Sequence, residues 1–157
     1  MKKILVFAAH PDDEILGCGA TLLKFIKKGY KVKTFFLSDG EGSRSISKKK
    51  LSNFVLRREK QAIIVSKKAK FEKPEFKRLP DNKLDSVPML DIVKFTERQI
   101  LTHRPEIIFT HFENDLNVDH QITFKAVMTA TRPMSRSFVK KIISFEIPSS
   151  TDFNFTV

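Results

Sequence analysis

The chain has 157 residues, of which 41% are hydrophobic and 15 are Phe, so it can bury the core of one domain and is too apolar for disorder. Its net charge of +11 comes without an aromatic-interleaved basic face or a nucleic-acid motif, and we expect no nucleic-acid partner. No apolar run approaches the ~18 residues of a transmembrane segment. The only cysteine, Cys18, excludes an internal disulfide and fits a reducing cytoplasm. We therefore expect one cytoplasmic domain over residues 1–157.

Apolar runs and helical patterns alternate along the chain. Residues 4–9 indicate a buried strand rather than a signal peptide, because His10 interrupts the apolar run at once. The pattern predicts further strands at 31–37, 76–79, 107–110 and 141–146. It predicts helices at 14–28, 51–68, 89–102 and from 120 to about 131, with a mobile polar loop at 41–50. Strands separated by helices predict an α/β fold, with a mostly parallel sheet between two helical layers.

Clusters of polar residues follow two of the predicted strands. One begins at His10, after the first strand, and the other begins at His111, after the strand at 107–110. In open parallel sheets, ligands bind beyond the carboxyl ends of the strands. The two clusters are therefore the candidate parts of one functional site.

The first cluster is His10-Pro11-Asp12-Asp13-Glu14. Catalytic zinc takes three protein ligands, often His and carboxylates, and keeps one open position. His10 and Asp13 lie three residues apart around a proline turn and can face one metal ion. Asp12 would then project beside the open position, where a carboxylate can accept a proton from water. Helix capping is the alternative reading of these acids, but capping does not explain His10.

The second cluster, His111 to His120, holds two His, two Asp, one Glu and two Asn in ten positions. His120 is placed to complete a His/Asp/His ligand set. Asp115 and Asp119 are candidates for orienting the ligand imidazoles by accepting their second ring N–H. A calcium loop starting at Asp115 is excluded, because His120 and Ala126 replace its required Gly and Glu. An Asn/Asp-rich turn that caps a helix remains the plainer alternative.

Both clusters resemble the motifs of a known enzyme family. Residues 9–14, Ala-His-Pro-Asp-Asp-Glu, followed by Gly17 and Gly19, resemble the hallmark of the PIG-L/LmbE-like de-N-acetylases. Residues 115–123 are similar to the second motif of this family, and residues 80–85 and 145–151 resemble a bacterial subgroup. The resemblance implies a Rossmann-like three-layer sandwich. It also implies zinc-dependent removal of the N-acetyl group from an N-acetylglucosamine-type sugar or a glycoconjugate precursor.

The resemblance implies roles for individual residues. By position, His10, Asp13 and His120 would bind Zn²⁺ or another divalent metal, and Asp12 would act as the general base. A nearby hydrogen-bond donor would stabilise the oxyanion that forms when the acetamide is attacked. Hydrolysis of an acetamide also requires a proton for the departing amine.

The chain departs from the family at the position expected to supply the hydrogen-bond donor to the oxyanion. Many members have a His three residues before the last ligand, and this chain has Asn117 there. Either Asn117 donates the hydrogen bond or His111 takes that part, so His111 and Asp119 stand beside Asp12 as catalytic candidates. Asn117, Arg57 and Asp81 are the candidates for contacts with the sugar or its anionic carrier.

A second hypothesis comes from the length of the chain. Relatives usually continue for several dozen residues past the segment 148–151, whereas this chain ends at Val157, so we expect the C-terminal part usual in the family to be lacking. The chain would then be a metal- and sugar-binding member that has lost turnover. The positive charge indicates either an ordinary solvated surface or attraction to a nucleotide-linked or lipid-linked sugar or an acidic membrane. A homo-oligomer is compatible with the sequence.

Overall fold

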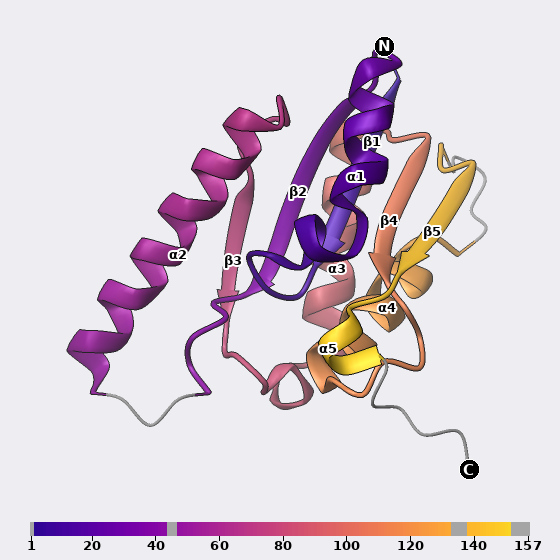
Figure 1. The fold of residues 1–157 in the computed structure, drawn as a ribbon. Coiled ribbons are helices and arrows are strands. Elements are labelled where there is room, and N and C mark those ends of the chain that lie inside the picture. Colours follow the sequence, from indigo (N-terminus) through magenta and orange to yellow (C-terminus); the bar gives the residue numbers. More distant parts are fainter. Residues whose placement is uncertain (1, 44–46, 133–137, 152–157) are drawn as a thin grey trace.

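The computed structural model describes residues 2–43, 47–132 and 138–151, and its strands form one sheet in which every pairing is parallel (Figure 1). The strands are β1 (Lys3–Ala8), β2 (Lys31–Ser38), β3 (Glu75–Leu79), β4 (Ile107–His111) and β5 (Lys141–Phe145). Their order across the sheet is β3-β2-β1-β4-β5. The order reverses between β1 and β4, because the chain proceeds outward from β1 in one direction and from β4 in the other.

Helices cover both faces of this sheet. The four long helices are α1 (Asp13–Lys27), α2 (Lys48–Lys68), α3 (Met89–His103) and α4 (Val118–Ala130). Residues of α1 and α2 share one buried cluster with the sheet, and residues of α3 and α4 share the other. The predicted α/β three-layer sandwich is therefore confirmed. Within the described ranges, no helix combines the length and the apolarity that a bilayer-spanning segment requires.

The central strand β1 shows why the sheet lies between two helical layers. Every residue from Ile4 to Ala8 is at most 1% exposed, as expected of a parallel strand with both faces covered. Ile4 and Val6 point into the cluster under α1 and α2, whereas Leu5 and Phe7 point into the cluster under α3 and α4. The continuous apolar run in the sequence is the direct consequence of this double burial.

The boundaries of some elements differ from the prediction. Helix α2 begins at Lys48, inside the predicted loop 41–50, of which residues 44–46 lie outside the described residues. Lysines at a helix start oppose the helix dipole and the first turn holds no acid, so the signal for a helix start is weak there apart from Ser47 at the N-cap. Two short elements were missed, a 3-10 turn at Leu84–Ser86 and helix α5 at Pro148–Thr151.

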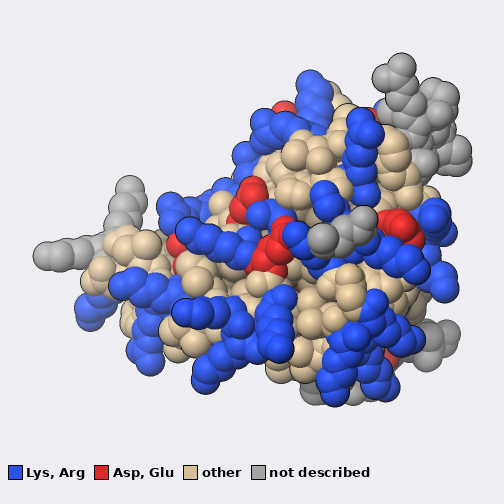
Figure 2. All heavy atoms as spheres, turned by 90° about the horizontal axis from the view of Figure 1, so that it is seen from above, with Lys and Arg blue, Asp and Glu red and all other residues tan. Residues whose placement is uncertain are grey.

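Basic side chains crowd the end of the molecule where the strands begin. Figure 2 looks onto this end and shows Lys and Arg over much of it, with Asp and Glu in a few small groups. The last turns of α1 and α2 carry Lys24, Lys27, Lys67 and Lys68, which complement the negative ends of the helix dipoles. The polar clusters that follow β1 and β4 lie at the opposite end of the sheet.

Candidate metal centre and active site

The reversal of strand order brings the two polar clusters together. β1 and β4 are paired parallel neighbours, so the loop after Ala8 and the loop after His111 leave the same edge of the sheet. Loops at such a reversal point diverge and leave a crevice between them. The first loop leads into α1 and the second leads into α4, which places His10, Asp13 and His120 in one buried group.

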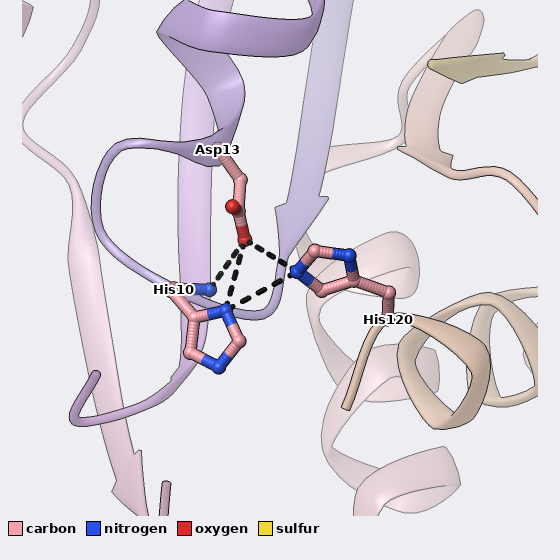
Figure 3. Close-up of side chains that lie close together, drawn as sticks. All are labelled: His10, Asp13 and His120. Atoms are coloured by element: carbon pink, nitrogen blue, oxygen red, sulfur yellow. Dashed lines mark hydrogen bonds and ion pairs between the residues drawn. The ribbon is translucent and has the colours of Figure 1, made fainter. Parts of the chain in front are cut away.

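The three predicted metal ligands point toward one another (Figure 3). His10 Nδ1 is 3.4 Å from Asp13 Oδ2 and 3.3 Å from His120 Nε2. The distance from His120 Nε2 to Asp13 Oδ2 is 3.5 Å. One ligand atom from each residue lies within 4.8 Å of the others, and all three residues are buried. Two imidazole nitrogens and one carboxylate oxygen form a donor set suited to a catalytic divalent metal with an open position.

Carboxylates hold the far ring nitrogen of each imidazole. His120 Nδ1 is 3.1 Å from Asp115 Oδ2, and His10 Nε2 is 3.1 Å from Asp119 Oδ2. The backbone N–H groups of Asn82 and Leu84 donate to Asp119 at 2.8 and 3.0 Å, so the loop after β3 fixes this carboxylate. Such partners set the tautomer and orientation of a metal-binding imidazole. The geometry therefore places Asp119 behind His10, where it orients the ring. Asp119 itself has no exposed surface that a substrate could contact.

The electrostatics of the group favour a cation at its centre. Burial would lower the pKa of His10, but the carboxylates of Asp119, Asp13 and Asp81 outweigh it and raise this pKa to about 11. Burial would likewise raise the pKa of Asp13, yet the surrounding imidazoles of His111, His10 and His120 keep it well below its usual range. The metal-free group thus binds protons where a divalent cation would compensate the same negative charge.

Asp81 is predicted from the sequence to contact the sugar, but it lies in the buried group around His10 and not on an open surface. Its side chain is buried, and its Oδ1 lies 3.1 Å from His10 Nε2. The backbone N–H of Ser43 donates to its Oδ2 at 3.0 Å. Asp81 and Asp119 therefore share one ring nitrogen, and with His10 they form a second set of closely spaced potential ligand atoms.

His111 lies beneath the ligands. Its ring stacks on that of His120 with centroids 3.9 Å apart and an interplanar angle of 10°. Its Nε2 accepts a hydrogen bond from the backbone N–H of Ala9 at 2.9 Å, and the side chain has no exposed surface. Burial lowers the pKa of His111, which favours the neutral ring. Through these contacts His111 packs against His120 and stabilises its position. The His111 ring is therefore not exposed where a substrate could bind.

The Asp12 carboxylate contacts helix α2. Arg58 Nη2 donates to Asp12 Oδ2 at 2.7 Å, and the Asp12 side chain remains half exposed. Burial and the neighbouring Asp13 raise the pKa of Asp12, although Arg58 opposes the rise. Arg57, the residue selected from the sequence, is exposed on the same helix. Adjacent arginines on a helix differ in direction by about 100°, and sequence alone did not reveal which one faces the site.

Asn117 caps the helix that carries His120. Its Oδ1 accepts hydrogen bonds from the backbone N–H groups of Asp119 at 2.8 Å and His120 at 3.3 Å. Its Nδ2 donates to Asn82 Oδ1 at 3.1 Å. The Asn/Asp-rich turn therefore caps helix α4, and this role coexists with the ligand set.

Glu14 is a buried polar residue whose role is not apparent from the sequence. It is 1% exposed, burial raises its pKa to about 8, and its Oε2 has no hydrogen-bond partner among the described residues. Glu14 lines a cavity of about 250 Å³ between α1 and α2, together with Asp12 and Arg58. Its position in the first cluster was the available signal, but an acid at a helix start is usually a solvated cap.

Comparisons with known proteins agree with this arrangement of motifs. The family model described as PIG-L, GlcNAc-PI de-N-acetylase, matches residues 5–131, which include all three candidate ligands. The chain belongs to this family. Among curated proteins, no sequence matches the chain.

Solved structures of this family fold resemble the chain over most of its length. The conserved protein TT1542 from Thermus thermophilus is 25% identical, with a TM-score of 0.73, and the match covers 93% of this chain and 66% of that one. N,N'-diacetylchitobiose deacetylase from Pyrococcus horikoshii is 20% identical, with a TM-score of 0.74, over 83% of this chain and 49% of that one. GalB, a 4-carboxy-2-hydroxymuconate hydratase from Pseudomonas putida, is 21% identical, with a TM-score of 0.71, over 83% and 56%. The chain thus spans about half to two thirds of these structures.

Proposed function

We propose that the chain is a metal-dependent hydrolase that removes the N-acetyl group from an N-acetylglucosamine-type sugar or glycoconjugate precursor. The observation that carries the proposal is the convergence of His10, Asp13 and His120, with Asp12 next to the ligand Asp13 in the chain. Membership of the PIG-L family and the likeness to a chitobiose deacetylase support the reaction class. Because a hydratase shares the fold, the fold alone does not choose the reaction.

Zinc is the metal that we assign to the site, with other divalent ions as alternatives. His10 Nδ1, Asp13 Oδ2 and His120 Nε2 would hold it, because these atoms converge while Asp119 and Asp115 occupy the opposite ring nitrogens. When bound, the metal supplies a Lewis acid that lowers the pKa of water toward ~7 and polarises the acetamide carbonyl.

Asp12 is the proposed general base. Its half-exposed carboxylate, with a pKa above the ordinary value, can accept the proton of the attacking water. The water oxygen bonds to the carbonyl carbon, the C–N bond breaks, and the proton taken up by Asp12 passes to the departing amine as acetate forms. Arg58 holds Asp12 through its 2.7 Å contact and keeps a positive charge beside the reacting centre.

Asn117 is the proposed donor to the oxyanion, in preference to His111. Asn117 keeps exposed surface, and its Nδ2 carries two N–H groups, one of which serves Asn82. His111 is fully buried beneath His120 and its Nε2 already accepts from Ala9. The sugar would then lie beside Asn117, and Arg57, exposed on α2, stays a candidate for contact with a nucleotide or lipid carrier.

A metal-resolved assay of acetate release tests the proposal. The protein is stripped with a chelator, reloaded with Zn²⁺, and incubated with acetamido sugars and their nucleotide conjugates. We expect acetate and free amine in equal amounts from the reloaded protein, and none from the stripped protein or from His120→Ala. Turnover by stripped protein would refute metal dependence. Ligand binding without acetate release would favour the binding-only hypothesis.

A further inference from the structure

The carboxylate that orients His120 is itself held by two hydroxyl groups. Asp115 has no exposed surface, and its Oδ2 lies 3.1 Å from His120 Nδ1. Thr151 Oγ1 donates to the same oxygen at 2.8 Å, and Ser150 Oγ donates to it at 3.0 Å. The backbone N–H of Asn117 donates to the other oxygen, Oδ1, at 2.9 Å. Both oxygens of this buried carboxylate are therefore engaged, which leaves it little freedom to rotate.

The two hydroxyls come from a distant part of the chain. Ser150 and Thr151 end the short helix α5, which follows β5, and they are 35 and 36 residues from Asp115 in the sequence. They lie beyond residues 5–131, the part of the chain that the family model matches. Figure 1 shows α5 below β5, at the same end of the sheet as the loop that leads into α4.

The packing of β5 delivers α5 to this position. The backbone N–H of Phe112 donates to the carbonyl of Phe145 at 3.0 Å, just beyond the paired residues of β4 and β5. At Gly17 of α1, a Cβ atom would overlap the ring of Phe145 and lie 2.9 Å from the carbonyl oxygen of Glu146. The absence of a side chain at Gly17 thus lets the end of β5 approach α1, and α5 begins two residues after Glu146.

We propose that Thr151 and Ser150 are positioning residues for the metal ligand His120. Thr151 acts through Asp115, and Ser150 acts through Asp115 and through its own 3.4 Å contact with His120 Nδ1. By fixing the Asp115 carboxylate, they hold the His120 ring so that its Nε2 points at His10 and Asp13. This inference rests on the proposed metal site and extends it to the segment after β5. It makes the geometry of the site depend on an element outside the matched family region.

The alternative hypothesis is that the two hydroxyls have a purely local role within α5. Thr151 Oγ1 also accepts a hydrogen bond from the backbone N–H of Ile147 at 3.0 Å, and Ser150 Oγ lies 3.4 Å from the Ile147 carbonyl. These contacts close the turn of α5. A residue that only closed this turn would change stability when mutated, without changing how His120 binds a metal.

The test compares metal binding by Thr151→Val, Ser150→Ala, the double variant and Thr151→Ser. Zn²⁺ affinity is measured by competition with a chelator, and the ligand field is read from the visible spectrum of the Co²⁺ form. We expect the double variant to bind Zn²⁺ roughly 10- to 100-fold more weakly, as for other outer partners of ligating imidazoles. Thr151→Ser should restore most of the affinity, and the Co²⁺ bands should shift in the variants that lose a hydroxyl.

Thr129→Val is the matched control, because Thr129 is exposed on α4 and its hydroxyl bonds to the Lys125 carbonyl, away from the site. Its Zn²⁺ affinity and Co²⁺ spectrum should equal those of the unmodified chain. Unchanged affinity, within twofold, and an unchanged Co²⁺ spectrum in the folded double variant would overturn the inference. If Thr151→Val fails to fold, Ser150→Ala carries the same comparison.

A metal-free measurement separates this inference from the proposed function. If the unmodified chain binds no metal, the proposed function fails, and ¹⁵N NMR of the His120 ring in the metal-free protein still tests the positioning. We expect the Nδ1 signal of His120 to show a strong hydrogen bond to Asp115 in the unmodified chain and a weaker one in the double variant. Identical ring spectra in the two proteins would overturn the inference.

Discussion

The carboxylate of Asp12 and the guanidinium of Arg58 lie 2.7 Å apart, which joins the loop after β1 to helix α2. Arg58 also donates to the carbonyl oxygens of Pro11 and Gly40 and to Glu41, so one side chain ties two loops to the helix. The candidate base is therefore positioned by a residue that is 46 positions away in the sequence. This contact predicts a specific change in the pH dependence of the reaction.

Replacing Arg58 by Ala removes the cation that opposes the raised pKa of Asp12. Asp12 acts as a base only when ionised, so a further rise of its pKa moves the acid limb of kcat/KM to higher pH. We expect the limb to shift upward and kcat/KM at pH 7 to fall roughly tenfold. The pH profile of acetate release measures both effects. Lys60→Ala, an exposed cation on the same helix, should leave the limb in place; an unmoved limb in Arg58→Ala would contradict the role of this contact.

Metal affinity should rise with pH. In the metal-free protein the pKa of His10 is about 11, so His10 carries a proton at neutral pH that must leave before its Nδ1 can bind a metal. Although burial opposes it, Asp13 and Asp115 also raise the pKa of His120. Each proton released makes the apparent affinity increase about tenfold per pH unit. Chelator competition at pH 6, 7 and 8 measures the slope. A pH-independent affinity would show that metal binding displaces no proton from His10 and would contradict this prediction.

Glu14→Gln should change how stability depends on pH. Burial raises the pKa of Glu14 from 4.5 to about 8, so the folded state favours the neutral acid. The stability that depends on this proton is complete below pH 4.5 and is lost as pH rises through 8. Since one pKa unit is about 1.4 kcal/mol, Glu14→Gln should gain a few kcal/mol relative to the unmodified chain at pH 9 and little at pH 4.5. Urea unfolding at the two pH values measures this difference, and exposed Glu113→Gln should show none.

Gly17→Ala should destabilise the fold and disturb the end of β5. The new Cβ would overlap Phe145, and overpacking of this kind costs about 1–3 kcal/mol. Gly19→Ala is the matched control, because its Cβ would meet only Ile15 at an ordinary 3.5 Å. Removing a flexible glycine from a helix interior there should stabilise by roughly 0.5–1 kcal/mol. Denaturant unfolding of the two variants should therefore give shifts of opposite sign.

The sequence predicted the parts of this molecule that depend on local pattern. Doubly buried β1 is a continuous apolar run, and the clusters at His10 and His111 follow strand ends, so the parallel sheet and the converging ligands could be inferred together. The pairing of Asp115 with an imidazole also followed from the chemistry of ligating His.

Contacts between distant segments could not be predicted in the same way. Nothing local indicates that Arg58 rather than Arg57 faces Asp12, because the direction of α2 depends on its packing. Asp81 was expected beside the sugar, and it lies buried against His10. The hydroxyls of Ser150 and Thr151 meet Asp115 only because β5 pairs with β4, and strand order was not specified by the pattern.

The position of the bound metal is the most direct test of the proposed site. Crystals grown with Zn²⁺ are measured on both sides of the zinc absorption edge, and an anomalous difference map locates the ion. We expect one zinc ion bonded to His10 Nδ1, Asp13 Oδ2 and His120 Nε2, at about 2.0–2.2 Å from each atom. A map without zinc among these three atoms, or with zinc bound only elsewhere, would contradict the assignment.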